Sequence, residues 1–455
     1  MNNLTSISPL DGRYQEKTSE LSPFVSEFAL IKARVGIEMK YLFSLSKINV
    51  VNLSKTEKIK LLSLLKKFDL RDAEKVKQIE ETTKHDVKAV ELYLKRFLKE
   101  ENSEMIHFGL TSEDINNLTY RIMLRSASED VIIPILESLL SKLSLNSQVF
   151  KGVVMLGRTH GQAAVPTTLG KEFAVFAMRL SSQLKLLNKV QFTGKLNGAI
   201  GNYNALHFAY PKIDWIRFSK RFIESLGFKP NLITTQINSF EDIIEYFQTV
   251  QRINGILLDL DQDLWRYISD GWLVQKSERG QIGSSTMPQK VNPIDFENSE
   301  GNLELANGLI EVFTRKLPVS RLQRDLSNST IIRNIGTVLG YSLLAYKGTL
   351  SGLSKIAVDR EQITKGLNKD WSILTEGVQT VLRRAGEKDP YSMVAKVSKG
   401  KKIGGDEWQE WVNKLPIDGK TKEELRALTP EKYIGQAEKL TDIALEEIAK
   451  SRKTV

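Results

Sequence analysis

One segment of about 30 residues, 240–269, constrains the fold of this chain more than any other. Its seam residues recur every three or four positions, which is the spacing of one face of an α-helix. A helix of this length spans roughly 45 Å, too long for a compact domain with a single core. Two seam positions are polar, which predicts a buried helix with several neighbours. The seam consists of Ile243, Phe247, Val250, Asn254, Leu257, Asp261, Leu264 and Ile268.

Helical spacing also runs through most of the remaining chain, whereas strand-like alternation is scarce and βαβ spacing is absent. We therefore expect an all-α protein. Pro134 lies inside an apolar run and predicts a kink, and Thr429 followed by Pro430 predicts the start of the last helix. Further helices are predicted over 55–68, 171–190, 295–315 and 328–356.

The lengths of the predicted helices divide the chain into three domains. Residues 1–112 have shorter helices, residues 113–355 hold the long helices, and residues 356–455 have short amphipathic helices. The central domain contains one long irregular segment, 280–293. A chain of 455 residues is long enough for two or three domains.

Composition excludes several classes of protein. The absence of cysteine rules out disulfides, zinc–thiolate sites and thiol nucleophiles. Without a signal-peptide pattern or a long apolar run, we expect a cytoplasmic protein that does not enter a membrane. The net charge of +10 suits either nucleic acid or small anionic substrates. Because the charges are interspersed and no nucleic-acid-binding motif accompanies them, the sequence favours small anions.

The segment GQIGSSTMPQKVNP, 280–293, interrupts the helical pattern most sharply. Its glycines and hydroxyl residues would expose several N–H and O–H donors beside the ammonium group of Lys290. Such donors suit a carboxylate or a developing negative charge. A plain connector between two helices is the alternative, and from these residue types alone it is the more common outcome.

The segment GRTHGQAAVPTTLG, 157–170, places His160 between Thr159 and Gly161, just before a helix predicted to begin near Leu169. A histidine beside a glycine in a loop is well placed for proton transfer. A single histidine is nevertheless more often structural or merely exposed, and that alternative stays open here.

Three further segments contain groups suited to anions. In HFGLTSEDINN, 107–117, Thr111 or Ser112 can cap a helix, and the free N–H groups of its first turn can hold a carboxylate. In TTKHDVKAVE, 82–91, a histidine adjoins an aspartate. Arginines and hydroxyls in SRLQRDLSNSTIIRN, 320–334, can bind a phosphate. Ordinary helix starts and solvated helix faces are the alternatives for all three.

Together these segments resemble a known family. GSSTMPQKVNP is similar to the signature loop of the fumarase/aspartase superfamily, whose members are long-helix proteins. SPLDGRY, TTKHDVKAVE, TSEDINNL, RTHGQ, GNYNA, TTQI, NPIDFENSEGN, LPVSRLQRDL and TPEKYIG resemble the adenylosuccinate lyase family of bacterial purine biosynthesis. The resemblance runs from residue 8 to about residue 437, which is nearly the whole chain.

This resemblance implies a carbon–nitrogen lyase with two substrates. It would split adenylosuccinate into AMP and fumarate, and the succinylated carboxamide ribotide SAICAR into AICAR and fumarate. Both reactions are β-eliminations that need no cofactor and no metal. The resemblance also implies the three-domain fold of the superfamily and a homotetramer in which three subunits contribute to each active site, and no nucleic acid or membrane takes part.

The resemblance also implies roles for individual residues. Ser284 matches the general base and His160 the general acid, and we expect the loop around Ser284 to close over bound substrate. The succinyl carboxylates would be held by Thr111, Ser112, Gln236, Ser285, Lys290 and Asn292. The ribose phosphate would be held by Arg13, Tyr14, Arg324, Ser329 and Arg333. Other substrate-binding positions are Lys84, His85, Asp86, Val291, Asn298, Thr330, Ile331 and Ile332.

The chain departs from the family pattern at three positions. Gln289 stands where a histidine is usual, which is similar to argininosuccinate lyase, and Lys84 and Ala163 replace a usual asparagine and proline. None of these changes removes a proton-transfer group, so we expect activity to survive. Two alternatives remain, namely a structural protein that kept this fold and lost catalysis, and a basic helical protein that binds nucleic acid.

Overall fold

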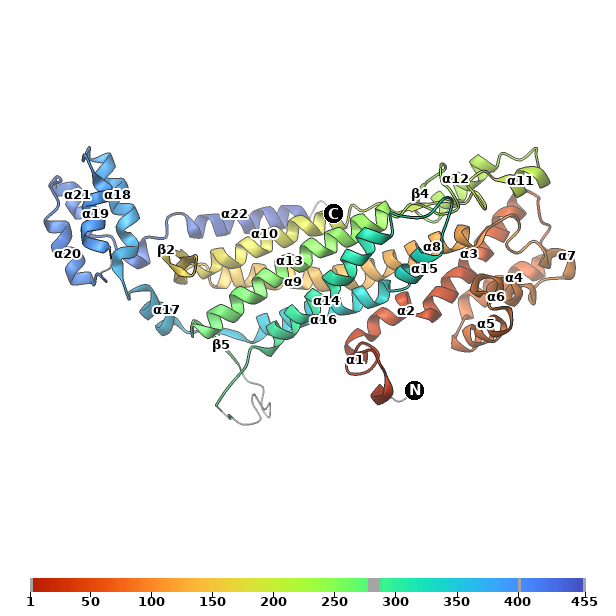
Figure 1. Cartoon of the computed structure of the whole chain (residues 1–455), viewed down its shortest axis with the longest axis horizontal. Helices are drawn as coiled ribbons and strands as arrows, with labels where there is room; N and C mark the ends of the chain where they lie inside the picture. The colour runs from red at the N-terminus through yellow and green to blue at the C-terminus, as the bar shows by residue number, and fades with distance from the viewer. Residues whose placement is uncertain (1–2, 277–286, 288, 400–401, 453–455) are drawn as a thin grey trace. The chain divides into compact units, whose positions relative to one another are not determined.

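The computed structural model describes residues 3–276, 287, 289–399 and 402–452. These residues are mostly helical, as the sequence predicts. Five helices of 17 to 29 residues dominate the region 133–355 (Figure 1), and the longest, α13, contains 29 residues. They are α9 (Ile133–Val149), α10 (Leu169–Leu187), α13 (Glu241–Ser269), α14 (Ile294–Lys316) and α16 (Ile335–Lys355).

The seam predicted over 240–269 is confirmed in α13. Its two polar members, Asn254 and Asp261, are buried together with their apolar neighbours. The amide group of Asn254 donates to the side chain of Asn307 in α14 at 3.0 Å. Asp261 accepts a hydrogen bond from the hydroxyl of Thr349 in α16 at 3.0 Å. Each polar seam residue is thus buried because a neighbouring helix supplies it with a partner.

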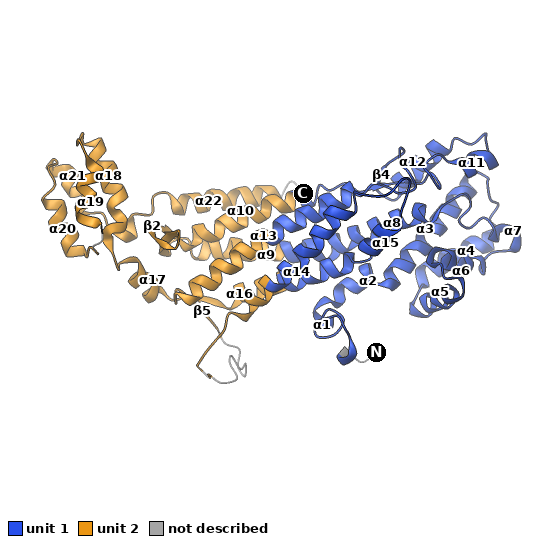
Figure 2. Ribbon diagram, viewed as in Figure 1, with its two compact units in different colours: residues 1–136, 186–254, 301–345 blue, residues 137–185, 255–300, 346–455 orange. Residues whose placement is uncertain are grey.

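Contacts between residues divide the chain into two compact units, coloured in Figure 2. Unit 1 consists of residues 1–136, 186–254 and 301–345, and unit 2 of residues 137–185, 255–300 and 346–455. Each of the five long helices contributes residues to both units. This grouping joins distant parts of the sequence, whereas the three predicted domains are consecutive, and the three-domain division stays a prediction.

Besides its parts of these five helices, unit 1 contains the 21-residue helix α3, several shorter helices and two very short strands. Its helix α3 is mainly buried on the face that packs against α8, and α3 also contacts α5 and α6. The helices are α1 (Gln15–Thr18), α2 (Ser22–Val25), α3 (Glu27–Lys47), α4 (Lys55–Lys67), α5 (Leu70–Thr83), α6 (Asp86–Lys95), α7 (Glu100–Ser103), α8 (Ser112–Ala127), α11 (Asn204–Ala209), α12 (Trp215–Ser225) and α15 (Ser327–Ile332). The strands β3 (Thr193–Gly194) and β4 (Lys229–Pro230) are parallel.

Unit 2 contains two antiparallel strand pairs and a set of short C-terminal helices. Strand β1 (Val154–Thr159) pairs with β2 (Gln162–Thr168), and β5 (Leu273–Gln275) pairs with β6 (Ile356–Val358). Arg452 in α22 donates to the side chain of Ser141 in α9 at 2.9 Å, which ties these two helices together. The helices are α17 (Arg360–Leu367), α18 (Thr375–Arg384), α19 (Pro390–Ser398), α20 (Gly405–Asn413), α21 (Gly419–Arg426) and α22 (Ala437–Arg452).

Pro134 and Pro430 both lie at the start of a helical segment. Pro134 is the second residue of α9, directly after a π-helical segment at Ser128–Ile132, so a helical irregularity lies beside the proline. The prediction that the last helix begins at Thr429 is wrong. Pro430 opens only a short 3-10 turn, and α22 begins at Ala437.

Among the residues described, we find no helix long and apolar enough to cross a membrane.

Candidate active site

Two predicted substrate-binding residues of unit 1 lie at the start of α8. Thr111 is the N-cap and Ser112 the first helical residue, so the predicted helix start is confirmed. The carboxylate of Asp114 accepts the backbone N–H of Thr111 at 2.9 Å. Because Asp114 is fully buried, this bond fixes the position of the cap. Both predicted residues are half-buried, so their polar groups remain within reach of a ligand.

Gln236 and Arg324, 88 positions apart in sequence, are brought together beside this helix start. The side-chain oxygen of Gln236 accepts from Nη1 of Arg324 at 2.9 Å. Nη2 of Arg324 lies 3.6 Å from a carboxylate oxygen of Glu113, in the first turn of α8. Gln236 and residues 322–326 line an open pocket of about 380 Å³. The pocket therefore joins a predicted carboxylate-binding residue to a predicted phosphate-binding residue.

Glu113, the buried partner of Arg324, has a carboxyl group with a shifted pKa. Burial raises its pKa to about 7, although the nearby charges of Arg324, Lys195 and Arg121 favour the ionised form. The sequence identified Glu113 only as a first-turn residue of a helix. Its burial depends on packing in unit 1, which the local sequence pattern does not contain.

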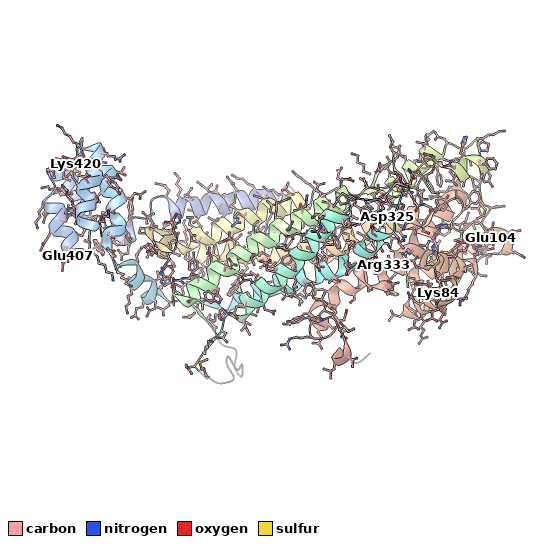
Figure 3. All side chains as sticks on the ribbon, viewed as in Figure 1. Lys84, Glu104, Asp325, Arg333, Glu407 and Lys420 are labelled. Carbon is pink, nitrogen blue, oxygen red and sulfur yellow. The ribbon has the colours of Figure 1, made fainter. Side chains whose placement is uncertain are left out.

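A second cluster in unit 1 is centred on Asp86. Oδ2 of Asp86 accepts from Nη2 of Arg34 and from Nη2 of Arg333, each at 2.7 Å. Although burial opposes ionisation, these two arginines and the backbone N–H of Val87 lower the pKa of Asp86 to about 2. Asp86 therefore stays ionised and holds Arg333, a predicted phosphate-binding residue, in place. Figure 3 labels Arg333 and Lys84, which both belong to unit 1.

Lys84 and His85 form the tight connection that leads to Asp86. Lys84 ends α5 in the left-handed conformation, with φ 53°. Nδ1 of His85 accepts the backbone N–H of Lys88 at 3.1 Å and so caps α6. Since Nδ1 is the acceptor, the N–H of the neutral ring lies on Nε2. Both side chains are exposed and available to a ligand.

The remaining predicted residues of unit 1 are less closely connected. The guanidinium of Arg13 lies 5.9 Å from the ring centroid of its neighbour Tyr14. Within the part of the chain that the structure describes, no hydrogen bond or ion pair joins these two residues to Arg324 or Arg333. Helix α15 carries the predicted residues Ser329, Thr330, Ile331 and Ile332, of which only Ile332 is fully buried.

The predicted proton donor His160 belongs to unit 2 and occupies the turn between β1 and β2. Thr159 pairs with Gln162, so His160 and Gly161 are the two residues of the turn. Both have positive φ, 52° and 73° respectively, which is typical of a type I′ turn. The predicted loop is thus a β-hairpin, and the helix after it begins at Leu169 as expected. The imidazole is exposed at the tip of this hairpin.

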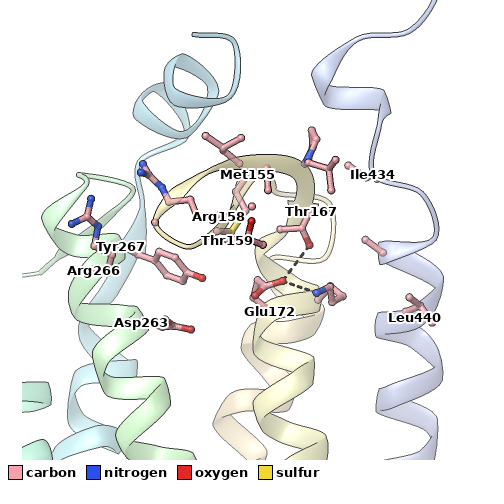
Figure 4. Close-up of a pocket in the computed structure, with 18 of the residues that line it drawn as sticks. Met155, Arg158, Thr159, Thr167, Glu172, Asp263, Arg266, Tyr267, Ile434 and Leu440 are labelled. Atoms are coloured by element: carbon pink, nitrogen blue, oxygen red, sulfur yellow. Dashed lines mark hydrogen bonds and ion pairs between the residues drawn. The ribbon is translucent and has the colours of Figure 1, made fainter. Parts of the chain in front are cut away.

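A cavity of about 770 Å³ lies beside this hairpin, between β1–β2, α13 and the start of α22 (Figure 4). Arg158 and Arg266 both form ion pairs with Asp270, at 3.1 and 3.0 Å. The guanidinium of Arg158 also stacks on Trp272, 5.0 Å from its ring centroid. The contacts of Arg158 hold the hairpin, close to the turn that carries the histidine, against the residues that follow α13. The cavity could not be predicted from the sequence, because its walls come from three distant segments.

The predicted signature loop is only partly described. Ser284 and Ser285, and with them the predicted base, lie outside the described residues. Lys290, Val291 and Asn292 precede α14, and the first two are exposed. Asn298 is an exposed residue of α14 itself.

Two groups of functional interest were missed by reasoning from sequence. Arg34, which holds Asp86, lies on the buried face of α3, and Lys195 is buried beside Asp114. Both are charged residues within apolar surroundings, and Arg34 shares its helix face with another buried charge, Glu38. A buried charge needs a partner, so this pattern is the signal that could have pointed to them.

Comparison with solved structures defines the fold. The chain is similar to a fumarate lyase from Mesorhizobium sp. BNC1, with a TM-score of 0.77 and 16% identity over 95% of this chain and 97% of the other. It is also similar to the 3-carboxy-cis,cis-muconate lactonizing enzyme of Pseudomonas putida, with a TM-score of 0.76 and 18% identity over 95% and 98% of the two chains. The architecture is therefore that of the fumarate-lyase-like enzymes.

Comparison of sequences identifies the family more closely than the fold does. A lyase family model matches residues 12–307, and an adenylosuccinate lyase C-terminal model matches residues 320–434. The adenylosuccinate lyase of Haemophilus influenzae is 45% identical over 97% of this chain and 99% of its own length. Those of Escherichia coli K12 and Dictyostelium discoideum are 44% and 45% identical over 97% and 96% of this chain, and over 99% and 97% of their own lengths.

These matches, together with the fold, place the chain among the lyases. More narrowly, the chain belongs to the adenylosuccinate lyase family. It is a carbon–nitrogen lyase that releases fumarate and functions in purine biosynthesis.

Proposed function

We propose that this enzyme converts adenylosuccinate to AMP and fumarate, and SAICAR to AICAR and fumarate. The observation that carries this proposal is the similarity to adenylosuccinate lyases over nearly the full length of both chains. The net charge of +10 suits substrates that carry two carboxylates and a phosphate. We expect the enzyme to act in the cytoplasm and to need no cofactor.

In the proposed mechanism, Ser284 and His160 transfer the protons. Ser284 removes a proton from the succinyl carbon beside a carboxylate, and the electron pair left behind forms the double bond of fumarate. The C–N bond breaks, and His160 protonates the departing nitrogen. Lys290 and nearby backbone N–H groups would stabilise the serine alkoxide and the developing negative charge. The exposed position of His160 at a hairpin tip supports its role, because the ring is accessible to a substrate.

Substrate binding is proposed to use the two clusters of unit 1 and the segment before α14. The succinyl carboxylates would contact Thr111, Ser112 and Gln236, together with Ser285, Lys290 and Asn292. The Asp86–Arg333 and Gln236–Arg324 contacts support the proposed phosphate-binding role of both arginines, since each guanidinium is oriented by a partner. Further phosphate or substrate contacts are proposed for Arg13, Tyr14, Lys84, His85, Asp86, Val291, Asn298, Ser329, Thr330, Ile331 and Ile332.

The enzyme is proposed to act as a homotetramer in which three subunits complete each active site. Large apolar side chains that are exposed on the long helices support an assembly, because they would be covered by other subunits. Leu145 on α9, Val175 on α10 and Leu305 on α14 are 55%, 41% and 53% exposed. Burial of these side chains in a subunit interface would be favourable.

One assay tests the proposed reaction directly. The purified protein is mixed with adenylosuccinate and, separately, with SAICAR, argininosuccinate and aspartate, and fumarate release is followed by its ultraviolet absorbance. We expect steady-state turnover with the first two compounds only. Turnover of argininosuccinate or aspartate instead would show that the substrate assignment is wrong, and no turnover at all would favour a structural protein that lost catalysis.

A further inference from the structure

A fully buried lysine connects the segments of unit 1 that are proposed to hold the succinyl group. Nζ of Lys195 donates to the backbone carbonyls of Gly198 and Gln236, at 2.8 and 2.7 Å. It also lies 3.1 Å from Oδ1 of Asp114, whose side chain is equally inaccessible to solvent. Two of its donors are thus used by backbone carbonyls, and the third contact is an ion pair. Because its side chain is inaccessible to solvent, Lys195 acts on protein groups and not on a ligand.

The partner of Lys195, Asp114, holds two backbone segments at once. Its Oδ2 accepts the N–H of Thr111 at 2.9 Å and that of Gly198 at 3.2 Å. Its Oδ1 accepts the N–H of Asn197 at 3.0 Å. The buried carboxylate thus joins the N-cap of α8 to the turn at 197–198. Three backbone N–H groups therefore converge on one carboxylate, which also lies beside the ammonium of Lys195.

The segment that contains Gln236 is held against the same turn. The side-chain N–H of Asn197 donates to the hydroxyl of Thr234 at 2.8 Å. Gly201 has φ +86°, and a Cβ atom there would lie 2.1 Å from the carbonyl oxygen of Thr234. Only glycine allows so close an approach in this conformation. The backbone near Gln236 is therefore packed directly on the segment 195–201.

From these contacts we propose that Lys195 is a positioning residue for the succinyl group. Its ammonium fixes the backbone of Gln236 relative to Thr111 and Ser112, so that the three residues present their donors to one carboxylate in a fixed arrangement. This inference rests on the proposed function, in which these residues hold the succinyl carboxylates. A donor arrangement fixed before the substrate arrives needs no reorganisation during the reaction.

Unit 1 contains a second buried ion pair that serves as a matched control. Arg121 donates to Asp242 twice, at 2.8 Å each, and to the backbone carbonyl of Ser239 at 2.6 Å. It is as buried as Lys195 and also belongs to the network around α8. None of its partners is proposed to contact substrate. Loss of this pair should affect stability in the same way and leave the succinyl contacts in place.

The experiment measures inhibition by the two products separately, in the full-length enzyme with adenylosuccinate as substrate. For Lys195→Met we expect kcat/KM to fall about 10²-fold, which is the usual effect of a misplaced binding group. The inhibition constant of fumarate should rise about 10-fold or more, and that of AMP should change far less. If Lys195 only stabilised the fold, its loss would not weaken inhibition by fumarate more than inhibition by AMP. A parallel rise for both products would therefore overturn the inference.

A second variant is needed because Lys195→Met leaves the charge of Asp114 buried and unpaired. The double variant Lys195→Met, Asp114→Asn removes both charges, while the amide oxygen can still accept the N–H of Thr111. It should fold and show the same fumarate-selective loss, whereas Arg121→Met, Asp242→Asn should not. An unchanged inhibition constant of fumarate in the first double variant, or an equal loss in the control, would each contradict the positioning role.

Gln236→Ala in the same assay separates this inference from the proposed function. We expect it to weaken fumarate inhibition as well, since the variant removes the proposed contact itself. If Gln236→Ala leaves fumarate inhibition unchanged, the proposed succinyl site is wrong. If Gln236→Ala weakens inhibition by fumarate and both Lys195 variants leave it unchanged, the proposed succinyl site is supported and the proposed role of Lys195 is wrong.

Discussion

At the residue scale, His160 carries the proposed chemistry and also an unusual backbone conformation. Its φ of 52° lies in the left-handed region, which asparagine tolerates better than most residues. His160→Asn therefore removes the imidazole with little change to the turn. We expect kcat to fall about 10²- to 10⁴-fold, because the departing nitrogen loses its proton donor. Steady-state assays with adenylosuccinate measure the effect.

His207 provides the matched control for this prediction. It is an exposed histidine of α11 with no proposed role. His207→Asn should leave kcat within about two-fold of the unchanged enzyme, since surface substitutions have small effects. If His160→Asn also keeps full activity, another group must protonate the departing nitrogen.

The sequence predicted the structural role of a residue best where its interaction partners are only a few positions away. The start of α8 at Ser112 follows from Thr111 and the acidic residues after it, because a helix cap involves only three or four consecutive residues. The contacts of Asp86 with Arg34 and Arg333 could not be predicted in this way. These partners lie 52 and 247 positions away, and only the packing of α3, α6 and the end of α15 brings them together.

At the element scale, α13 carries a carboxyl group that should make stability depend on pH. Burial raises the pKa of Asp261 to about 8, although hydrogen bonds from Ser299 and Thr349 oppose this. In the unfolded chain the carboxyl titrates near pH 4. Between about pH 4 and pH 8 the folded state therefore binds more protons, so this group's contribution to the free energy of unfolding decreases as pH rises.

Asp261→Asn removes this titration while keeping a polar group of similar size. The gain in the free energy of unfolding relative to the unchanged protein should be roughly 3 kcal/mol larger at pH 8 than at pH 5. Urea denaturation at one protein concentration measures this difference. Asp259→Asn is the control on the same helix, because Asp259 is exposed and pairs with Arg179, and it should show no such trend. A gain for Asp261→Asn that is the same at both pH values would contradict the prediction.

At the scale of the whole molecule, the proposed homotetramer makes activity depend on assembly. Each chain has a mass of 51.5 kDa, so light scattering should give about four times this value at micromolar concentration. Dilution below the dissociation constant of the tetramer should lower specific activity and mass together, because each active site needs several subunits. Full specific activity in a species with the mass of one chain would show that the sites are not shared.

The sequence by itself determined the helical class, the position of the longest helix and the family. These follow from repeated spacing and from short motifs, which depend on neighbouring residues. It did not predict the hairpin under His160, because positive φ at two successive residues becomes apparent only when the strands pair. Only the tertiary structure showed which charged partners Arg34, Glu113 and Lys195 have. Buried charges need partners from distant segments, and packing decides which segments meet.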